Sequence, residues 1–94
     1  MDKIFISTDL KRCDLIKDHE SFAVYLYLMM EASRTVEHKV TNHSFELIQD
    51  LMQISDDGLK RCIDCLEDRG LVRICSDGLE VIESEFIRFD SMTD

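Results

Sequence analysis

The stretch from residue 55 to residue 82 constrains the fold of this chain more than any other. It opens with Ser55, a good helix N-cap. The apolar residues that follow recur at helical spacing and are Leu59, Cys62, Ile63 and Leu66. Gly70 then suits the C′ position that ends a helix. Two short apolar segments, 71–75 and 79–82, flank the turn at 76–78, whose Asp-Gly pair is typical of a β-hairpin. The pattern predicts a third helix over about 56–69 and a hairpin turning at 76–78.

The segments upstream predict two strands and two more helices. Residues 3–7 are short, apolar and β-branched, which indicates an edge strand. Residues 20–34 predict the first helix, and the weak alternation of residues 36–42 predicts a short strand. Ser44 offers the N-cap of a second helix that ends at the break Gln53-Ile54. The apolar stripe predicted for this helix consists of Phe45, Leu47, Ile48, Leu51 and Met52.

Length and composition limit the chain to one domain of class α+β. A chain of 94 residues buries about two-thirds of its surface on folding, which allows one core. The absence of proline and the presence of only three glycines argue against a sandwich or barrel built from many turns. We expect a single domain over 1–94, with a core at about 3–83 and an acidic C-terminal segment at 84–94. That segment is predicted to be either a last strand or a tail that docks on the domain.

The order of the predicted elements is that of a winged helix-turn-helix domain. The residues at the positions of core, cap and helix stop are Leu47, Leu51, Ile54, Ser55, Leu59, Cys62, Ile63, Leu66, Gly70, Leu71 and Val72. Over about residues 3–83 the chain resembles the winged-helix domains of replication initiators, replisome organizers and small regulators of Gram-positive phages and plasmids. The resemblance implies three main helices, a C-terminal hairpin wing and a short N-terminal strand. It also implies a role in DNA replication or transcription regulation of a mobile element.

The charge distribution departs from that of a DNA reader. The net charge is −9, and residues 44–94 carry thirteen acids against five bases, while residues 1–43 carry seven against six. DNA affinity comes mainly from cations that neutralise phosphates. The third helix instead holds five acids. We predict that they form a partner-binding acidic face: Asp56, Asp57, Asp64, Glu67 and Asp68. The bases left for an alternative DNA-binding face are Lys60, Arg61 and Arg73.

These observations lead to two functional hypotheses. The first is a non-enzymatic regulatory module that acts mainly through a protein partner with a basic surface. In one form it is an acidic inhibitor that imitates DNA and occupies the groove of a nucleic-acid-binding host or defence protein. The alternative is a sequence-specific DNA-binding transcription regulator or replication initiator domain, because a dimer could gather bases from two chains onto one face.

The apolar run from Phe22 to Met30 has two interpretations. Nine residues are too few for a membrane span, which needs about 20. A helix that is apolar all round must be covered on more than one side. Most of the run therefore belongs to the core. The small size of the domain also predicts a homodimer, in which a stripe of Tyr25, Leu28 and Met29 forms the self-association surface.

The four cysteines predict free thiols rather than a metal centre. Cys62-x-x-Cys65 could form a four-thiolate zinc site with Cys13 and Cys75. The second Cys-x-x-Cys of the usual zinc knuckle is missing, however. We therefore expect reduced cysteines and no cofactor.

No catalytic constellation is recognisable. The three histidines, His19, His38 and His43, belong to no His-Glu-x-x-His pattern, and no Ser or Cys nucleophile has an identifiable base. The chain is therefore predicted not to be an enzyme. The N-terminus lacks a basic patch followed by a hydrophobic stretch, so we expect a cytoplasmic location.

Overall fold

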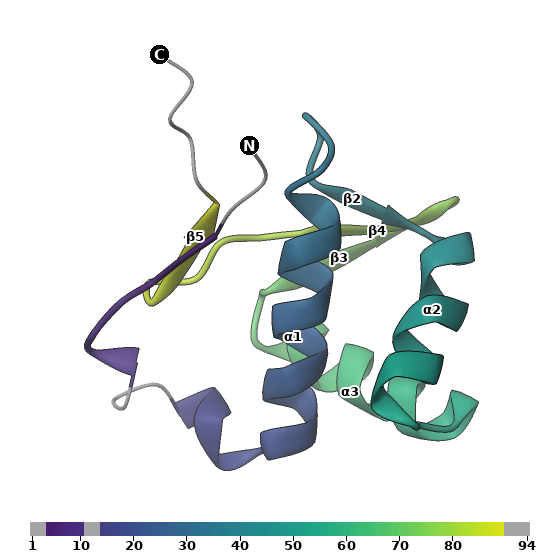
Figure 1. The fold of residues 1–94 in the computed structure, drawn as a ribbon, viewed down its shortest axis with the longest axis horizontal. Helices are drawn as coiled ribbons and strands as arrows, with labels where there is room; N and C mark the ends of the chain where they lie inside the picture. The colour runs from purple at the N-terminus through teal and green to yellow at the C-terminus, as the bar shows by residue number, and fades with distance from the viewer. Residues whose placement is uncertain (1–3, 11–13, 90–94) are drawn as a thin grey trace.

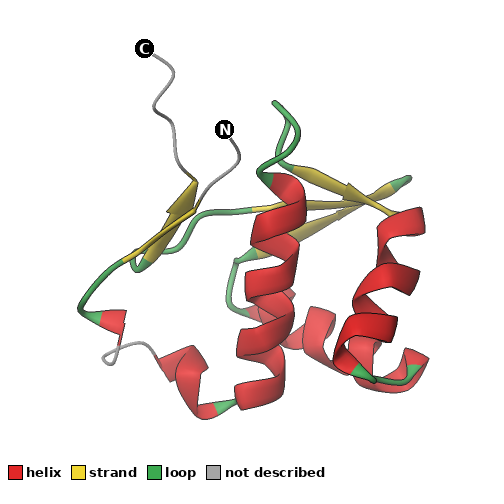
Figure 2. Ribbon diagram, in the orientation of Figure 1, coloured by secondary structure: helices red, strands yellow, loops and turns green. Residues whose placement is uncertain are grey.

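The computed structural model describes residues 4–10 and 14–89 and shows a small α+β fold (Figure 1). Within these residues, three α-helices and two small antiparallel sheets make up the fold (Figure 2). The elements in chain order are β1 (Ile4–Ile6), the 3-10 helix η2 (Asp14–Lys17), α1 (His19–Ala32), β2 (Lys39–Thr41), α2 (Asn42–Met52), α3 (Asp56–Asp68), β3 (Val72–Cys75), β4 (Gly78–Val81) and β5 (Ile87–Phe89).

Helix α1 is fixed at its start by a side-chain cap. The Asp18 carboxylate accepts a hydrogen bond from the Ser21 backbone N–H at 3.3 Å and another from the Ser21 hydroxyl at 2.8 Å. The helix has 14 residues. Among the described residues, no helix reaches the length and apolarity needed to cross a bilayer.

Helix α2 begins earlier than predicted. Its N-cap is Thr41 rather than Ser44, because β2 leads directly into the helix and Thr41 still has extended dihedral angles. The strand predicted at 36–42 is also shorter in the structure, where it spans Lys39–Thr41. His38 has a φ of 56°, so extended pairing starts only at Lys39. At its other end, α2 stops at Gln53, which is left-handed with a φ of 55°.

Helix α3 confirms the predicted boundaries to within a residue. The Ser55 hydroxyl accepts the Gly58 backbone N–H at 3.1 Å, as expected for an N-cap. Gly70 has a φ of 77° and ends the helix. The Gly70 N–H donates to the Glu67 carbonyl and the Leu71 N–H to the Leu66 carbonyl, the two bonds of a Schellman motif.

A three-stranded antiparallel sheet combines β2, from between α1 and α2, with the two strands after α3, in the order β2-β4-β3. The predicted hairpin is confirmed: β3 and β4 pair with Val72 opposite Val81 and Cys75 opposite Gly78. Strand β2 pairs along the other edge of β4, with Thr41 opposite Gly78. Strand β2, which leads directly into α2, is thereby paired with the hairpin that follows α3.

The second sheet corrects the predicted limits of the core. Strand β5 pairs antiparallel with β1, and together they form a separate two-stranded ribbon (Figure 1). Ile87 and Phe89 are buried, while Arg88 between them is exposed. The His38 ring stacks on Phe89 with centroids 3.7 Å apart. The core therefore extends at least to residue 89 rather than ending near 83, because β5 alternates inward and outward side chains.

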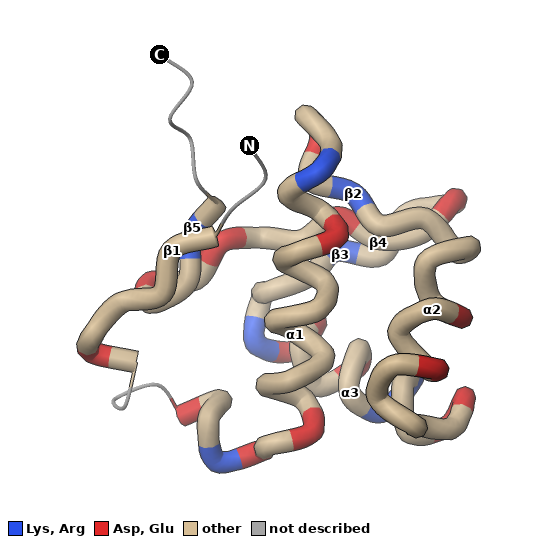
Figure 3. The backbone as a smooth tube through the Cα atoms, viewed as in Figure 1, with Lys and Arg blue, Asp and Glu red and all other residues tan. Residues whose placement is uncertain are grey.

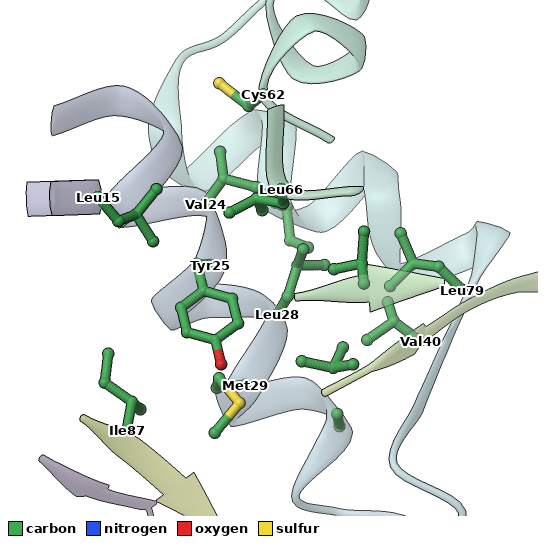
Figure 4. Packing of buried hydrophobic residues seen from close by; sticks show 14 of the residues in the cluster. Leu15, Val24, Tyr25, Leu28, Met29, Val40, Cys62, Leu66, Leu79 and Ile87 are labelled. Carbon is green, nitrogen blue, oxygen red and sulfur yellow. The ribbon is translucent and has the colours of Figure 1, made fainter. Parts of the chain in front are cut away.

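Helix α1 is the centre of the core (Figure 4). Its contacts include α2, α3, η2, β2 and β4. Tyr25, Leu28 and Met29 are fully buried, and the Tyr25 hydroxyl donates to the Ile82 carbonyl at 2.6 Å. These three residues therefore cannot form the predicted self-association surface. The prediction was wrong because the 3-10 helix and the later strands cover sides of α1 that the sequence pattern left uncovered.

Candidate functional site

The outward side of α3 gathers the five acids predicted to bind a partner. Leu59, Cys62 and Leu66 face the core. At 3.6 residues per turn, the five acids fall within an arc of about 120° on the other side of the helix. All five are exposed: Asp56, Asp57, Asp64, Glu67 and Asp68. We call this surface the acidic face.

The charge of the acidic face is not compensated by ion pairs within the described chain. Only Asp56 accepts a hydrogen bond from a neighbouring helix, from the Gln49 amide of α2. Between residues 4–10 and 14–89, no salt bridge involves any of its five carboxylates. Figure 3 shows further acidic positions on α2. A partner would therefore meet carboxylates that are free to form new ion pairs.

Two of the three bases assigned to the alternative DNA-binding face are already ion-paired. Arg61 pairs with Glu20 and, at 3.6 Å, with Asp18, both at the start of α1. The Glu20 hydrogen bond, with smaller contributions from nearby charges, raises the pKa of the guanidinium. Arg73 pairs with Glu80, the residue opposite it in the hairpin.

Lys60 is the remaining base of that set, and it forms no salt bridge with a described residue. It lies on the acidic face, on α3, whereas Arg73 lies on the hairpin and is tied to its own partner strand. Lys60 and Arg61 are thus neighbours on α3, while Arg73 belongs to a different element, β3.

Around Arg61, a polar network joins α1 to α3. Hydrogen bonds from Ser21, together with the Arg61 charge, hold the pKa of Asp18 below its usual value. The Cys65 thiol lies 3.8 Å from the same carboxylate. Burial raises the pKa of the Cys62 thiol, which favours an unreactive core cysteine. This network holds the Arg61 guanidinium against the start of α1.

The cysteines show no metal centre among the residues that the structure describes. Cys62, Cys65 and Cys75 are free thiols, and no three His, Cys, Asp or Glu side chains in this part of the chain meet as a metal site would require. Cys13, the fourth candidate ligand, lies outside the described residues.

An apolar groove borders the acidic face and was not predicted from the sequence. It lies between α2, α3 and β3 and has a volume of about 310 Å³. Its lining consists of Phe45, Gln49, Asp56, Leu59, Lys60, Ile63, Asp64 and Ile74. A signal for it was present in β3, because residues 72 and 74 share one face of the strand. Val72 is buried, whereas Ile74 is 53% exposed, so this face of the sheet continues beyond the core and into the groove.

Comparisons of the chain with protein-family models, with curated proteins and with solved structures found no match. The function is therefore inferred from the acidic face, the state of the bases and the groove.

Proposed function

We propose that this chain is a winged helix-turn-helix module that regulates a DNA transaction by binding a basic protein surface through its acidic face. The element order α1-β2-α2-α3-β3-β4 supports the winged-helix part of the proposal, as does the strand order β2-β4-β3. In this arrangement α3 takes the position of the recognition helix and the β3–β4 hairpin that of the wing.

The observation that carries the proposal is the contrast between acids and bases on α3. Five exposed carboxylates have no ion pair within the described residues, while Arg61 is paired with Asp18 and Glu20. A DNA backbone that approached α3 would meet these carboxylates at close range and would find Lys60 as the free base of the predicted set. Non-specific DNA affinity needs several such cations.

A basic protein groove would gain from the same arrangement. Arg and Lys side chains form charge-assisted hydrogen bonds with carboxylates, and a face of one sign accelerates the encounter with its partner. In its most specific form, the module acts in the cytoplasm as an inhibitor encoded by a mobile element. Its acidic face then occupies the nucleic-acid groove of a host or defence protein. No dimer is needed for this mode of binding.

A neutralisation experiment tests the proposal. The variant Asp64→Asn with Asp68→Asn keeps the shape of α3 and removes two charges from the acidic face. Its matched control, Glu37→Gln with Glu85→Gln, removes two exposed charges elsewhere. The probes are a 14-residue Arg- and Lys-rich peptide and a labelled DNA duplex, each measured by fluorescence anisotropy at two salt concentrations.

We expect the Asn variant to bind the basic peptide about 2- to 30-fold more weakly, since each exposed ion pair contributes about 0.2–1 kcal/mol and neighbouring pairs act together. The salt dependence of its peptide binding should also become weaker, whereas the control variant should lose less affinity for the peptide. The DNA duplex should not bind. Salt-sensitive binding of the wild-type chain to DNA, abolished by Lys60→Gln, would establish the alternative, a DNA-binding regulator or replication initiator domain.

A further inference from the structure

The groove between α2, α3 and β3 has an apolar floor that solvent can reach. Four of its eight lining residues are apolar: Phe45, Leu59, Ile63 and Ile74. Leu59 is nearly buried, Phe45 and Ile63 are half-buried, and Ile74 has more than half of its surface exposed. Side chains from three different elements thus converge on one hollow. A partner side chain placed there would cover apolar surface that the folded chain leaves in water.

The rim of the groove is charged, with a surplus of acid. Asp56 and Asp64 border it from α3, and Lys60 lies between them in the sequence and also lines the groove. Gln49 completes the rim from α2 and donates to Asp56. Asp57 lies beyond the rim, on the same acidic face. A ligand seated in the groove therefore has carboxylates beside it, within the reach of long basic side chains.

From this combination we infer that the groove binds an apolar anchor side chain in a basic segment of the partner protein. The inference rests on the proposed function, because it names what the partner of the acidic face must carry. The recognised chemistry is one aliphatic or aromatic side chain flanked by Lys or Arg. A volume of about 310 Å³ is at the small end for ligand pockets, so it suits one or two side chains rather than a whole cofactor.

Charge argues against two other occupants of the groove, a second copy of this chain and nucleic acid. A second copy of this chain has a net charge of −9 and would bring its own carboxylates to an acidic rim. Nucleic acid would bring phosphates to the same rim and has no aliphatic side chain for the floor. A basic amphipathic segment satisfies both the rim and the floor, with the anchor buried in the manner of an interface hot spot.

Two synthetic peptides of equal length and charge test the inference. One places leucines at helical spacing among lysines, and the other has serine in place of each leucine. Each is titrated into the isotope-labelled full chain, and amide chemical shifts are followed by NMR. The two protein variants are Ile74→Ser, in the groove, and Val36→Ser, at a residue that is 97% exposed and does not line the groove.

We expect the leucine peptide to bind about tenfold more tightly than the serine peptide, with the largest shifts at the groove residues of α2, α3 and β3. Ile74→Ser should remove most of this preference, and Val36→Ser should retain it. Shift mapping on the wild-type chain gives a result even if Ile74→Ser folds poorly.

Three results would overturn the inference. Equal binding of the two peptides would show that the acidic face binds basic peptides without an apolar anchor in the groove. A leucine preference with its shifts at Met30 or at β1 would place the anchor elsewhere. Binding of neither peptide would overturn the proposed function together with the groove.

Discussion

Gly78, the first residue of β4, is the position where a single added methyl group should do most harm to the hairpin. Its φ is 157°, and a Cβ built there would lie 2.0 Å from the Val40 carbonyl oxygen and 2.9 Å from the Thr41 Cα. Both neighbours are backbone atoms of β2, so no rotamer change can relieve the collision. Gly78→Ala must therefore push β2 away from β4 and weaken the pairing of Thr41 with Gly78.

Gly70→Ala provides the matched control for this prediction. Gly70 also has a positive φ, 77°, but a Cβ there would meet nothing within 4 Å. The left-handed conformation costs alanine about 1–2 kcal/mol, and the stiffer unfolded chain returns about half of this. We therefore expect Gly70→Ala to lower the free energy of unfolding by about 1 kcal/mol, a fall in Tm of about 4–8 °C.

Gly78→Ala carries a similar backbone cost plus the collision and the lost strand pairing. We expect a loss of at least about 3 kcal/mol and a fall in Tm of roughly 12 °C or more. Thermal unfolding followed by circular dichroism measures both variants, and amide hydrogen exchange of Lys39–Thr41 reports on β2. If the two alanine variants unfolded within about 1 kcal/mol of each other, the close approach of β2 to Gly78 would be refuted.

Three further predictions concern Met29, the helix-cap carboxylate of Asp18 and the thiol of Cys62. Met29→Glu should lower the free energy of unfolding, measured by urea titration, by at least about 3 kcal/mol, because it buries an unpaired charge. A stable, folded variant would contradict the burial of Met29. Because folding lowers the pKa of Asp18, this carboxylate stabilises the fold above its unfolded pKa of about 4 and loses that effect as pH falls. Asp18→Asn should therefore show a smaller loss of stability as the pH falls below about 4 in urea titrations, and an unchanged pH profile would contradict this. Cys62 should react with a thiol reagent at pH 8 more slowly than Cys75, as measured by mass spectrometry of the native chain; equal rates would speak against its burial.

Local sequence signals determined the elements from α3 to β4. Ser55 caps α3 and Gly70 ends it, as predicted, and the hairpin turns within the predicted 76–78, at Ser76 and Asp77, with Gly78 as the first residue of β4. These features depend on contacts between residues close in sequence, with backbone preferences that a single residue type supplies. The acidic face was predictable for the same reason, because a helix with one apolar stripe must present its charged residues on the other side.

Long-range packing decided what the local patterns left open. The apolar run 22–30 could not tell which of its residues would face neighbours in the same chain, and Tyr25, Leu28 and Met29 proved to be core. In α2, Ile48 is buried, whereas Leu47 and Leu51 from the same predicted stripe are exposed. An apolar pattern shows that a helix has something to bury, but the neighbours choose which residues are covered.

The features of the candidate site also divide into those that the sequence predicted and those that tertiary packing decided. From the sequence alone came the single α+β domain, its helix and hairpin order and the excess of acid on α3. Only the tertiary structure decided that Arg61 is tied to Glu20, 41 residues away, and that Arg73 faces Glu80. It also brought Phe45, Ile63 and Ile74 together into the groove. The physical reason is that ion pairs and grooves form between surfaces of different elements, and their distances are set by packing rather than by spacing along the chain.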